Sequence, residues 1–316
     1  MNYQDLARKI VPYQKIWLND LMKKSGLLQS ALYEPSNLGD RDVQEVFTSV
    51  ASGNFRNLAG GVTVQDVDTK LVETQLLLLS LAMRINEDYV KRIGGFERAI
   101  ASRLPALLEG MGQTAAKQLF YGGTTDEADS DGFYGLRKLA INYGNIINKA
   151  GTGGTGIYAV KWERGRSSLV YNSMVVGSAN DAGSLFSLTQ IADGNVISEY
   201  NSSTGKEYYF RKALIDTQLA LRIATDYCVG AIVNVDSSHK PTLDNLVQLI
   251  DMVKGSPTDT VIYVSRLGRR YIRALKEADL MLDPSMNDYS SYVGSIEGVK
   301  VMLDENIKDV ETDYSA

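Results

Sequence analysis

Apolar residues recur at steps of mostly three and four from Phe96 to Gly123, the spacing that gathers side chains on one face of a helix. The members of this stripe are Ile100, Leu104, Leu107, Leu108, Met111, Ala115 and Leu119. A continuous helix over the segment would be roughly 42 Å long. Pro105 removes one intrahelical hydrogen bond and favours a kink. The pattern therefore predicts either two helices that meet near Pro105 or one long helix against which other elements pack.

A second pattern has a period of two residues and predicts a long strand at 213–223. One face carries Ala213, Ile215, Thr217, Leu219, Leu221 and Ile223, and the other face carries Lys212, Asp216, Gln218 and Arg222. We expect the apolar face to pack on the stripe of the long helix, with Leu219 against Leu108.

Two further β-runs, Val43–Val50 and Val62–Val67, are separated by the turn-rich stretch ASGNFRNLAGG. This arrangement predicts a long hairpin that is polar on both faces and therefore serves no core. A lone hairpin is only marginally stable in water, so something else is expected to cover it. We expect its tip to contact another subunit through Gly53, Asn54, Phe55, Arg56 and Asn57.

Shorter patterns predict the remaining elements. Leu71–Asn86 is helical or extended, and Thr242 begins a helix that ends before Gly255 and Pro257. The predicted strands are Tyr158–Trp162, Ser168–Tyr171, Cys228–Val235, Thr260–Val264 and Gly298–Leu303, and a basic helix is predicted at Arg266–Ala278. Helices and strands do not alternate regularly, which favours an α+β class over a doubly wound fold.

Composition narrows the classes of function. The 316 residues carry a net charge of -5, so the chain lacks the basic balance of a dedicated nucleic-acid binder. Its one cysteine, Cys228, cannot form an intrachain disulfide, and its one histidine, His239, cannot form a multi-histidine metal site. The most apolar run, Leu76–Ala82, is too short to span a bilayer, and no signal peptide is evident at the N-terminus. We expect no metal, no cofactor and no membrane contact.

Two short motifs invite chemical interpretations. The glycine-rich stretch GTGGTG at 151–156 precedes a predicted strand, whereas a dinucleotide-binding loop follows a strand and opens a helix. We interpret it as a flexible surface loop that binds no nucleotide. The stretch EADSDG at 127–132 resembles the start of a calcium loop, but Lys138 stands where the bidentate glutamate should be. We interpret it as a solvated acidic turn, and the sequence provides no catalytic constellation.

Four stretches, in order along the chain, resemble tailed-phage major capsid proteins. They are EGMGQTAAKQLFYGGTTDEADSDGFYGLRKLA (109–140), GIYAVKWERGRSSLVY (156–171), YYFRKALIDTQLALRIATDYCVGAIVNVD (208–236) and GVKVMLDENI (298–307). The similarity extends from Gln44 to the C-terminus. It implies an α+β fold of the Hong Kong 97 type, in which the long helix is a spine. The implied parts are an N-terminal arm (1–38), an extended β-hairpin loop (39–72), a peripheral domain (73–125 and 195–236) and an axial domain (126–194 and 237–316).

The resemblance also implies a function. It predicts a non-enzymatic major capsid protein that self-assembles into hexamers and pentamers of an icosahedral shell around packaged double-stranded DNA. Portal and scaffolding proteins, and a decoration protein, are the implied partners, with assembly in the host cytoplasm. The DNA-facing candidates are Lys15, Lys23, Lys24, Arg98 and Arg103. Two alternatives are an encapsulin-type cargo shell, which shares the fold, and an enzyme that uses the loop at 151–156.

Overall fold

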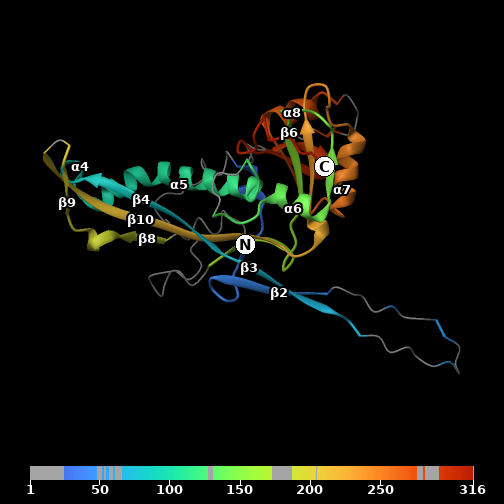
Figure 1. Ribbon diagram of the computed structural model, residues 1–316, viewed down its shortest axis with the longest axis horizontal. Coiled ribbons are helices and arrows are strands. Elements are labelled where there is room, and N and C mark those ends of the chain that lie inside the picture. Colours follow the sequence, from blue (N-terminus) through green and yellow to red (C-terminus); the bar gives the residue numbers. More distant parts are fainter. Residues whose placement is uncertain are drawn as a thin grey trace.

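The chain forms an elongated molecule from which a hairpin projects. A computed structural model describes residues 25–47, 52, 55–56, 60, 66–126, 131–172, 187–203, 205–275, 280–281 and 292–315. A long helix and long strands extend to one side, a rounded body holds the C-terminal end, and the hairpin points away from both (Figure 1).

The first half of the chain supplies the hairpin and the long helix. Its elements are α3 (Gly26–Ser30), β1 (Tyr33–Pro35), β2 (Arg41–Phe47), β3 (Thr69–Gln75), β4 (Leu77–Asn86), α4 (Glu87–Ile93), α5 (Phe96–Tyr121), α6 (Leu136–Tyr143), β5 (Ile146–Asn148), β6 (Thr155–Lys161) and β7 (Ser167–Tyr171). The second half supplies β8 (Ser187–Gln190), η1 (Ile191–Gly194), β9 (Ile197–Asn201), β10 (Lys206–Ile223), η2 (Asp226–Cys228), β11 (Val229–Val235), α7 (Leu243–Met252), β12 (Thr260–Val264), α8 (Arg266–Arg273), β13 (Leu280–Met281), β14 (Tyr292–Ile296) and β15 (Val299–Leu303).

One sheet is organised around the 18-residue strand β10. On one edge β10 pairs antiparallel with β4, from Phe210 opposite Asn86 to Leu219 opposite Leu77. Along its other edge it pairs in turn with β9, β8 and β7, and β1 adds parallel to β7. A single strand thus runs the length of this sheet and joins four others.

The second sheet has seven strands in the order β13-β14-β15-β12-β6-β11-β5. Its central strands are covered on both faces. In β6, successive side chains point alternately to one covered face and to the other. Ile157 and Ala159 pack with α7 and α8, whereas Tyr158 and Val160 pack with α6 and the end of α5. Burial on both faces explains why β6, β11 and β12 are apolar almost throughout.

Helix α5 is one uninterrupted helix of 26 residues, with Pro105 inside it. Of the two predicted alternatives, the single long helix is therefore confirmed. It packs along β10 in three successive clusters. Ala213 lies with the first turn of α5, Ile215 lies with Leu108 and Met111, and Leu221 lies with the last turns.

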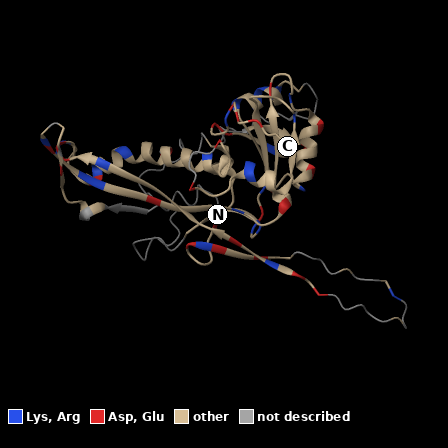
Figure 2. Cartoon of the chain, in the orientation of Figure 1, with Lys and Arg blue, Asp and Glu red and all other residues tan. Residues whose placement is uncertain are grey.

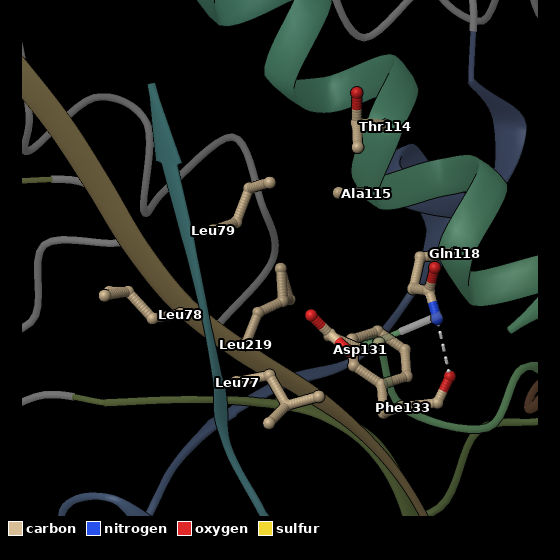
Figure 3. A pocket seen from close by; sticks show the side chains of 10 residues that line it. Leu77, Leu78, Leu79, Thr114, Ala115, Gln118, Asp131, Phe133 and Leu219 are labelled. Carbon is tan, nitrogen blue, oxygen red and sulfur yellow. Dashed lines mark hydrogen bonds between the residues drawn. The ribbon is translucent and has the colours of Figure 1, made fainter. Parts of the chain in front are cut away.

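The predicted contact between Leu219 and Leu108 is wrong, because Leu108 clusters with Ile215. Leu219 instead lines a pocket beside Ala115 and Gln118 (Figure 3). A strand advances about 3.3 Å per residue and a helix about 1.5 Å, so the two residue counts run out of step along a shared axis. The four residues from Ile215 to Leu219 advance by about nine helical residues.

Several predicted boundaries also differ. The second hairpin strand is β3, Thr69–Gln75; of the predicted strand Val62–Val67 only residues 66 and 67 are described, and they are not in a strand. Cys228 is buried in the short turn η2 before β11 and is not part of the strand. The basic helix α8 ends at Arg273. The division into arm, loop, peripheral and axial parts stays a prediction, although β11 joins the sheet of β5 and β6 while β7 joins that of β10.

We predict that Leu108→Ala and Ile215→Ala each lower the free energy of unfolding by about 2–5 kcal/mol, since both side chains are buried in one cluster. The double variant should lose less than the sum, because the two residues share contacts. Urea denaturation of the unassembled subunit measures all three values. Leu78→Ala, on an exposed side chain of β4, is the control and should change little. Strictly additive losses would show that the two residues do not pack together.

Candidate assembly interface

The hairpin of β2 and β3 is a two-stranded sheet with little cover of its own. Its seven residue pairs run from Arg41 opposite Gln75 to Phe47 opposite Thr69. Most side chains of both strands are exposed or half-buried, and the exposed ones include Phe47 and Leu71. Basic and acidic residues are interspersed along the hairpin and the long strands (Figure 2). The expectation of an outward hairpin without a core is thus confirmed for its described residues.

A buried ion cluster anchors the base of the hairpin. Arg222 on β10 is 2% exposed, and its guanidinium donates to the carboxylates of Asp42 on β2, at 2.5 Å, and Glu34 on β1. Asp42 is only 1% exposed. The alternating pattern placed Arg222 on the charged face of the strand but did not reveal these two carboxylate partners. The cluster joins the first strand of the hairpin to the longest strand of the body.

Hydrogen bonds to backbone groups reinforce the base of the hairpin. The side-chain amide of Asn37 donates to the carbonyl of Val43 at 2.6 Å and accepts from its N–H at 3.0 Å, as a paired strand residue would. The N–H of Leu76 donates to the carbonyl of Asp40 at 2.9 Å. The hairpin therefore leaves the body at a defined place and in a defined direction.

At the hairpin tip the structure describes two of the five predicted contact residues. Phe55 is fully exposed, and Arg56 donates from Nη1 to the carbonyl of Gly60 at 2.7 Å. Gly53, Asn54 and Asn57 lie outside the described residues. A fully exposed phenyl ring at the end of a projecting hairpin is unfavourable in water, which suits a contact made in an assembly.

The predicted DNA-facing residues are only partly placed. Lys15, Lys23 and Lys24 lie outside the described residues, whereas Arg98 and Arg103 are exposed on α5. The two arginines are five positions apart on α5, which places their side chains about 140° apart around the helix axis. Arg103 also donates to the carbonyl of Arg84 at 3.3 Å and lies 4.9 Å from the ring centroid of Tyr89. The two arginines therefore do not form one basic patch.

The glycine-rich stretch 151–156 lies at the surface only at Thr152 and Gly153, whereas Gly151, Gly154 and the start of β6 are buried, so its interpretation as a flexible surface loop is only partly right. A Cβ on Gly154 would lie 2.4 Å from the carbonyl oxygen of Val235. The N–H of Thr152 donates to Asp236 at 3.2 Å, and that of Gly153 donates to Asp313 at 2.7 Å. A phosphate placed on these N–H groups would meet two carboxylates. The glycines allow close approach of the backbone to β11 and the C-terminal segment.

A second buried ion cluster, which the sequence did not reveal, holds the C-terminal segment. Glu311 accepts from the hydroxyls of Tyr121, at 2.7 Å, and Tyr158, at 2.9 Å, and lies 3.4 Å from Arg137. Burial raises the pKa of Glu311, although Arg137 and the two hydroxyls favour its charged form. For Asp126, burial would raise the pKa, but hydrogen bonds from the Thr312 backbone and Lys308 outweigh it and lower the pKa. The cluster ties the end of α5 to residues close to the C-terminus.

Within the described ranges, His, Cys, Asp and Glu side chains form no group of three or more that could hold a metal ion. In the same part of the chain, the helices are too short or too polar to cross a bilayer.

Comparison with known proteins identifies the family. The model of the family described as major capsid protein GP7 matches residues 17–312. The chain belongs to this family. Its role is that of a structural protein of the capsid shell, and its place is the virion capsid. No curated protein matches the chain.

Comparison with solved structures bears on the fold of this GP7-family chain. A chain in the cryo-EM-derived structure of bacteriophage Epsilon15 is 15% identical, with a TM-score of 0.55, over 90% of this chain and 88% of that one. The α+β capsid fold expected from sequence is thereby confirmed. The bacteriophage JBD30 capsid is 11% identical over 97% and 99% of the two chains, with a TM-score of 0.48. The SrpI encapsulin of Synechococcus elongatus PCC 7942 is 12% identical over 66% and 87%, with a TM-score of 0.44.

We predict that Arg222→Met destabilises the subunit by about 3–5 kcal/mol, because it leaves the buried carboxylate of Asp42 without its cation. The further changes Asp42→Asn and Glu34→Gln should recover part of this loss. Arg41→Met is the control, since Arg41 forms an exposed ion pair with Glu73, and should cost no more than about 1 kcal/mol. Equal losses for the two single variants in urea denaturation would contradict the role of Arg222.

Two glycine substitutions should act in opposite directions. Gly154→Ala should cost about 1–3 kcal/mol, because its Cβ would press on the backbone of β11. Gly110→Ala lies within α5, where a Cβ meets open space, and should stabilise by about 1 kcal/mol. Thermal unfolding of both variants tests the pair. An unchanged melting temperature for Gly154→Ala would show that the loop yields easily.

Proposed function

We propose that copies of this capsid shell protein assemble into hexamers and pentamers of an icosahedral shell, and that the β2–β3 hairpin of each copy lies on a neighbouring copy. The observation that carries this proposal is the hairpin itself. It is anchored by the buried Arg222 at its base, yet exposes Phe47, Leu71 and Phe55 beyond it. Burying those side chains against a second subunit would supply the cover that the single chain lacks.

The shell is proposed to enclose packaged double-stranded DNA and to be assembled in the host cytoplasm. Membership of a capsid protein family supports a shell that encloses DNA, because capsids enclose genomes. With a net charge of -5, contacts to DNA should be few, made to phosphates and weakened by salt. Arg98 and Arg103 are the described candidates, and Lys15, Lys23 and Lys24 are the others. Portal and scaffolding proteins, and a decoration protein, are the further partners proposed.

The encapsulin-type shell is the alternative that shares this fold. The two differ in content, because an encapsulin shell encloses protein cargo. Purified particles that protect double-stranded DNA from nuclease support the phage shell, whereas particles that hold only protein would favour the alternative. An enzymatic role through the loop at 151–156 is not proposed, because the N–H groups of Thr152 and Gly153 already donate to carboxylates.

We predict that replacing residues 53–57 by a two-residue Asn-Gly turn leaves the subunit soluble but abolishes particle formation. The change shortens the hairpin beyond the last described pair, Phe47 opposite Thr69, and leaves the Arg222 cluster intact. Sedimentation and negative-stain microscopy measure particle yield, and the urea midpoint of the free subunit checks its fold. Particles at the yield of the unchanged chain would refute the role of the tip.

A further inference from the structure

Helix α8 presents an arginine face on the rounded body, away from the hairpin (Figure 1). Its eight residues include no aspartate or glutamate, and four of them are arginines: Arg266, Arg269, Arg270 and Arg273. Steps of three and four place these side chains on one side of the helix. On the opposite side Ile272 is buried, and Tyr271 packs with the core beside β6 and β12. The side of α8 that meets solvent is therefore cationic (Figure 2).

The four arginines repel one another. Each lies three or four positions from two of the others, and like charges at these spacings destabilise a helix. Arg266 forms an ion pair with Glu305 at 2.5 Å. The described residues offer Arg269, Arg270 and Arg273 no ion pair. The free subunit therefore carries uncompensated positive charge on this face, although the chain as a whole has a net charge of -5.

The chemistry of this arginine face indicates the kind of partner. Arg270 and Arg273 are exposed, and the exposed large hydrophobic side chains of the described residues all lie outside α8. Protein interfaces centre on apolar and aromatic anchors, whereas the DNA backbone is bound through repeated charge contacts. A guanidinium also binds phosphate through two parallel N–H donors, which lysine cannot supply. The arginine face therefore matches a row of phosphates better than it matches a protein surface.

The length of the arginine face fits this partner. Arg266 and Arg273 are seven positions apart, a rise of roughly 10 Å along the helix. Double-stranded DNA carries one negative charge per about 1.7 Å of its axis, so that length faces about six phosphates. Each of the three arginines without an ion pair can then contact a phosphate of its own. Contacts to phosphates fix position and carry no preference for base sequence.

We propose that the arginine face of α8 binds the phosphate backbone of the packaged double-stranded DNA. This inference rests on the proposed function and adds a new set of residues to the DNA-facing candidates named there. Phosphates neutralise the guanidiniums, and this relieves the repulsion that the free subunit tolerates. Helix α8 thus gives an acidic chain a local surface for a polyanion.

Binding of a duplex of about 20 base pairs to the free full-length subunit tests the surface, with fluorescence anisotropy as the measurement. Replacing all three of Arg269, Arg270 and Arg273 by Gln should weaken binding at least tenfold in about 50 mM salt. It should also make the plot of log K against log salt less steep by about 2–3, because each phosphate contact contributes about 0.9 to that slope. Replacing the same three residues by Lys keeps the charges and should retain most of the slope.

A matched control removes the same net charge elsewhere. Lys91→Gln, Arg164→Gln and Lys206→Gln together change three exposed residues on other parts of the chain and should leave the slope unchanged. The urea midpoints of the glutamine variants should match that of the unchanged chain, since the side chains replaced on α8 carry no ion pair. A slope unchanged by the α8 glutamines, an equal loss for the control, or lysine variants as weak as the glutamine variants would each overturn the proposal.

Photo-crosslinking in assembled particles locates the contact. Azidophenylalanine at position 270 should crosslink to DNA in filled particles, whereas the same probe in place of Tyr200, an exposed residue of β9, should not. Equal labelling of DNA from both positions, or crosslinks from position 270 only to protein, would overturn this inference and leave the proposed function standing; the second result would identify an acidic protein surface as the partner. Particles of the unchanged chain that hold no nuclease-protected DNA overturn both.

Discussion

The packing of α5 along β10 is the contact on which the shape of the subunit depends. One strand of 18 residues and one helix of 26 run beside each other, and three clusters of apolar side chains join them. Because a helix and a strand rise by different amounts per residue, their apolar positions cannot match at every turn. The mismatch falls at Leu219 and Ala115, where the unfilled pocket lies. An extended subunit of this kind covers area with few layers, as a shell requires.

Buried charge then fixes what apolar packing alone would leave free. Arg222 can satisfy two carboxylates only when β1, β2 and β10 meet in one arrangement, so the cluster defines where the hairpin begins. Exchanging such a cluster for apolar residues is often neutral for stability, whereas removing one partner is costly. The Arg222 cluster therefore contributes mainly by fixing the direction in which the hairpin leaves the body. A hairpin that, as proposed, lies on another subunit needs a fixed base more than it needs an internal core.

The C-terminal segment is held in the same manner in the rounded body of the molecule (Figure 1). Glu311, Arg137 and Asp126 are all buried or nearly so, and two tyrosine hydroxyls complete the hydrogen bonding of Glu311. Glycines at 151 and 154 let the loop before β6 lie directly on β11 beside this segment. The C-terminal segment therefore covers part of the seven-stranded sheet. The hairpin and the pocket beside α5 have no such cover among the described residues. The well-packed body is thus separate from the exposed hairpin and from the unfilled pocket.

Local periodicity determined much of this protein from sequence alone. The stripe of α5, the alternation along β10 and the cap at Thr242 each depend on neighbours in the chain, and each gave its element correctly. The α+β class and the outward hairpin followed from the same patterns. Local periodicity does not reveal contacts between residues that are far apart in the sequence. The partners of Arg222 could not be read from the strand pattern, because Glu34 and Asp42 lie some 180 residues away. The packing of Gly151 and Gly154 could not be read either, because it depends on β11, which lies far along the chain. Only the tertiary structure decides which faces are covered, because coverage depends on contacts that no local pattern encodes.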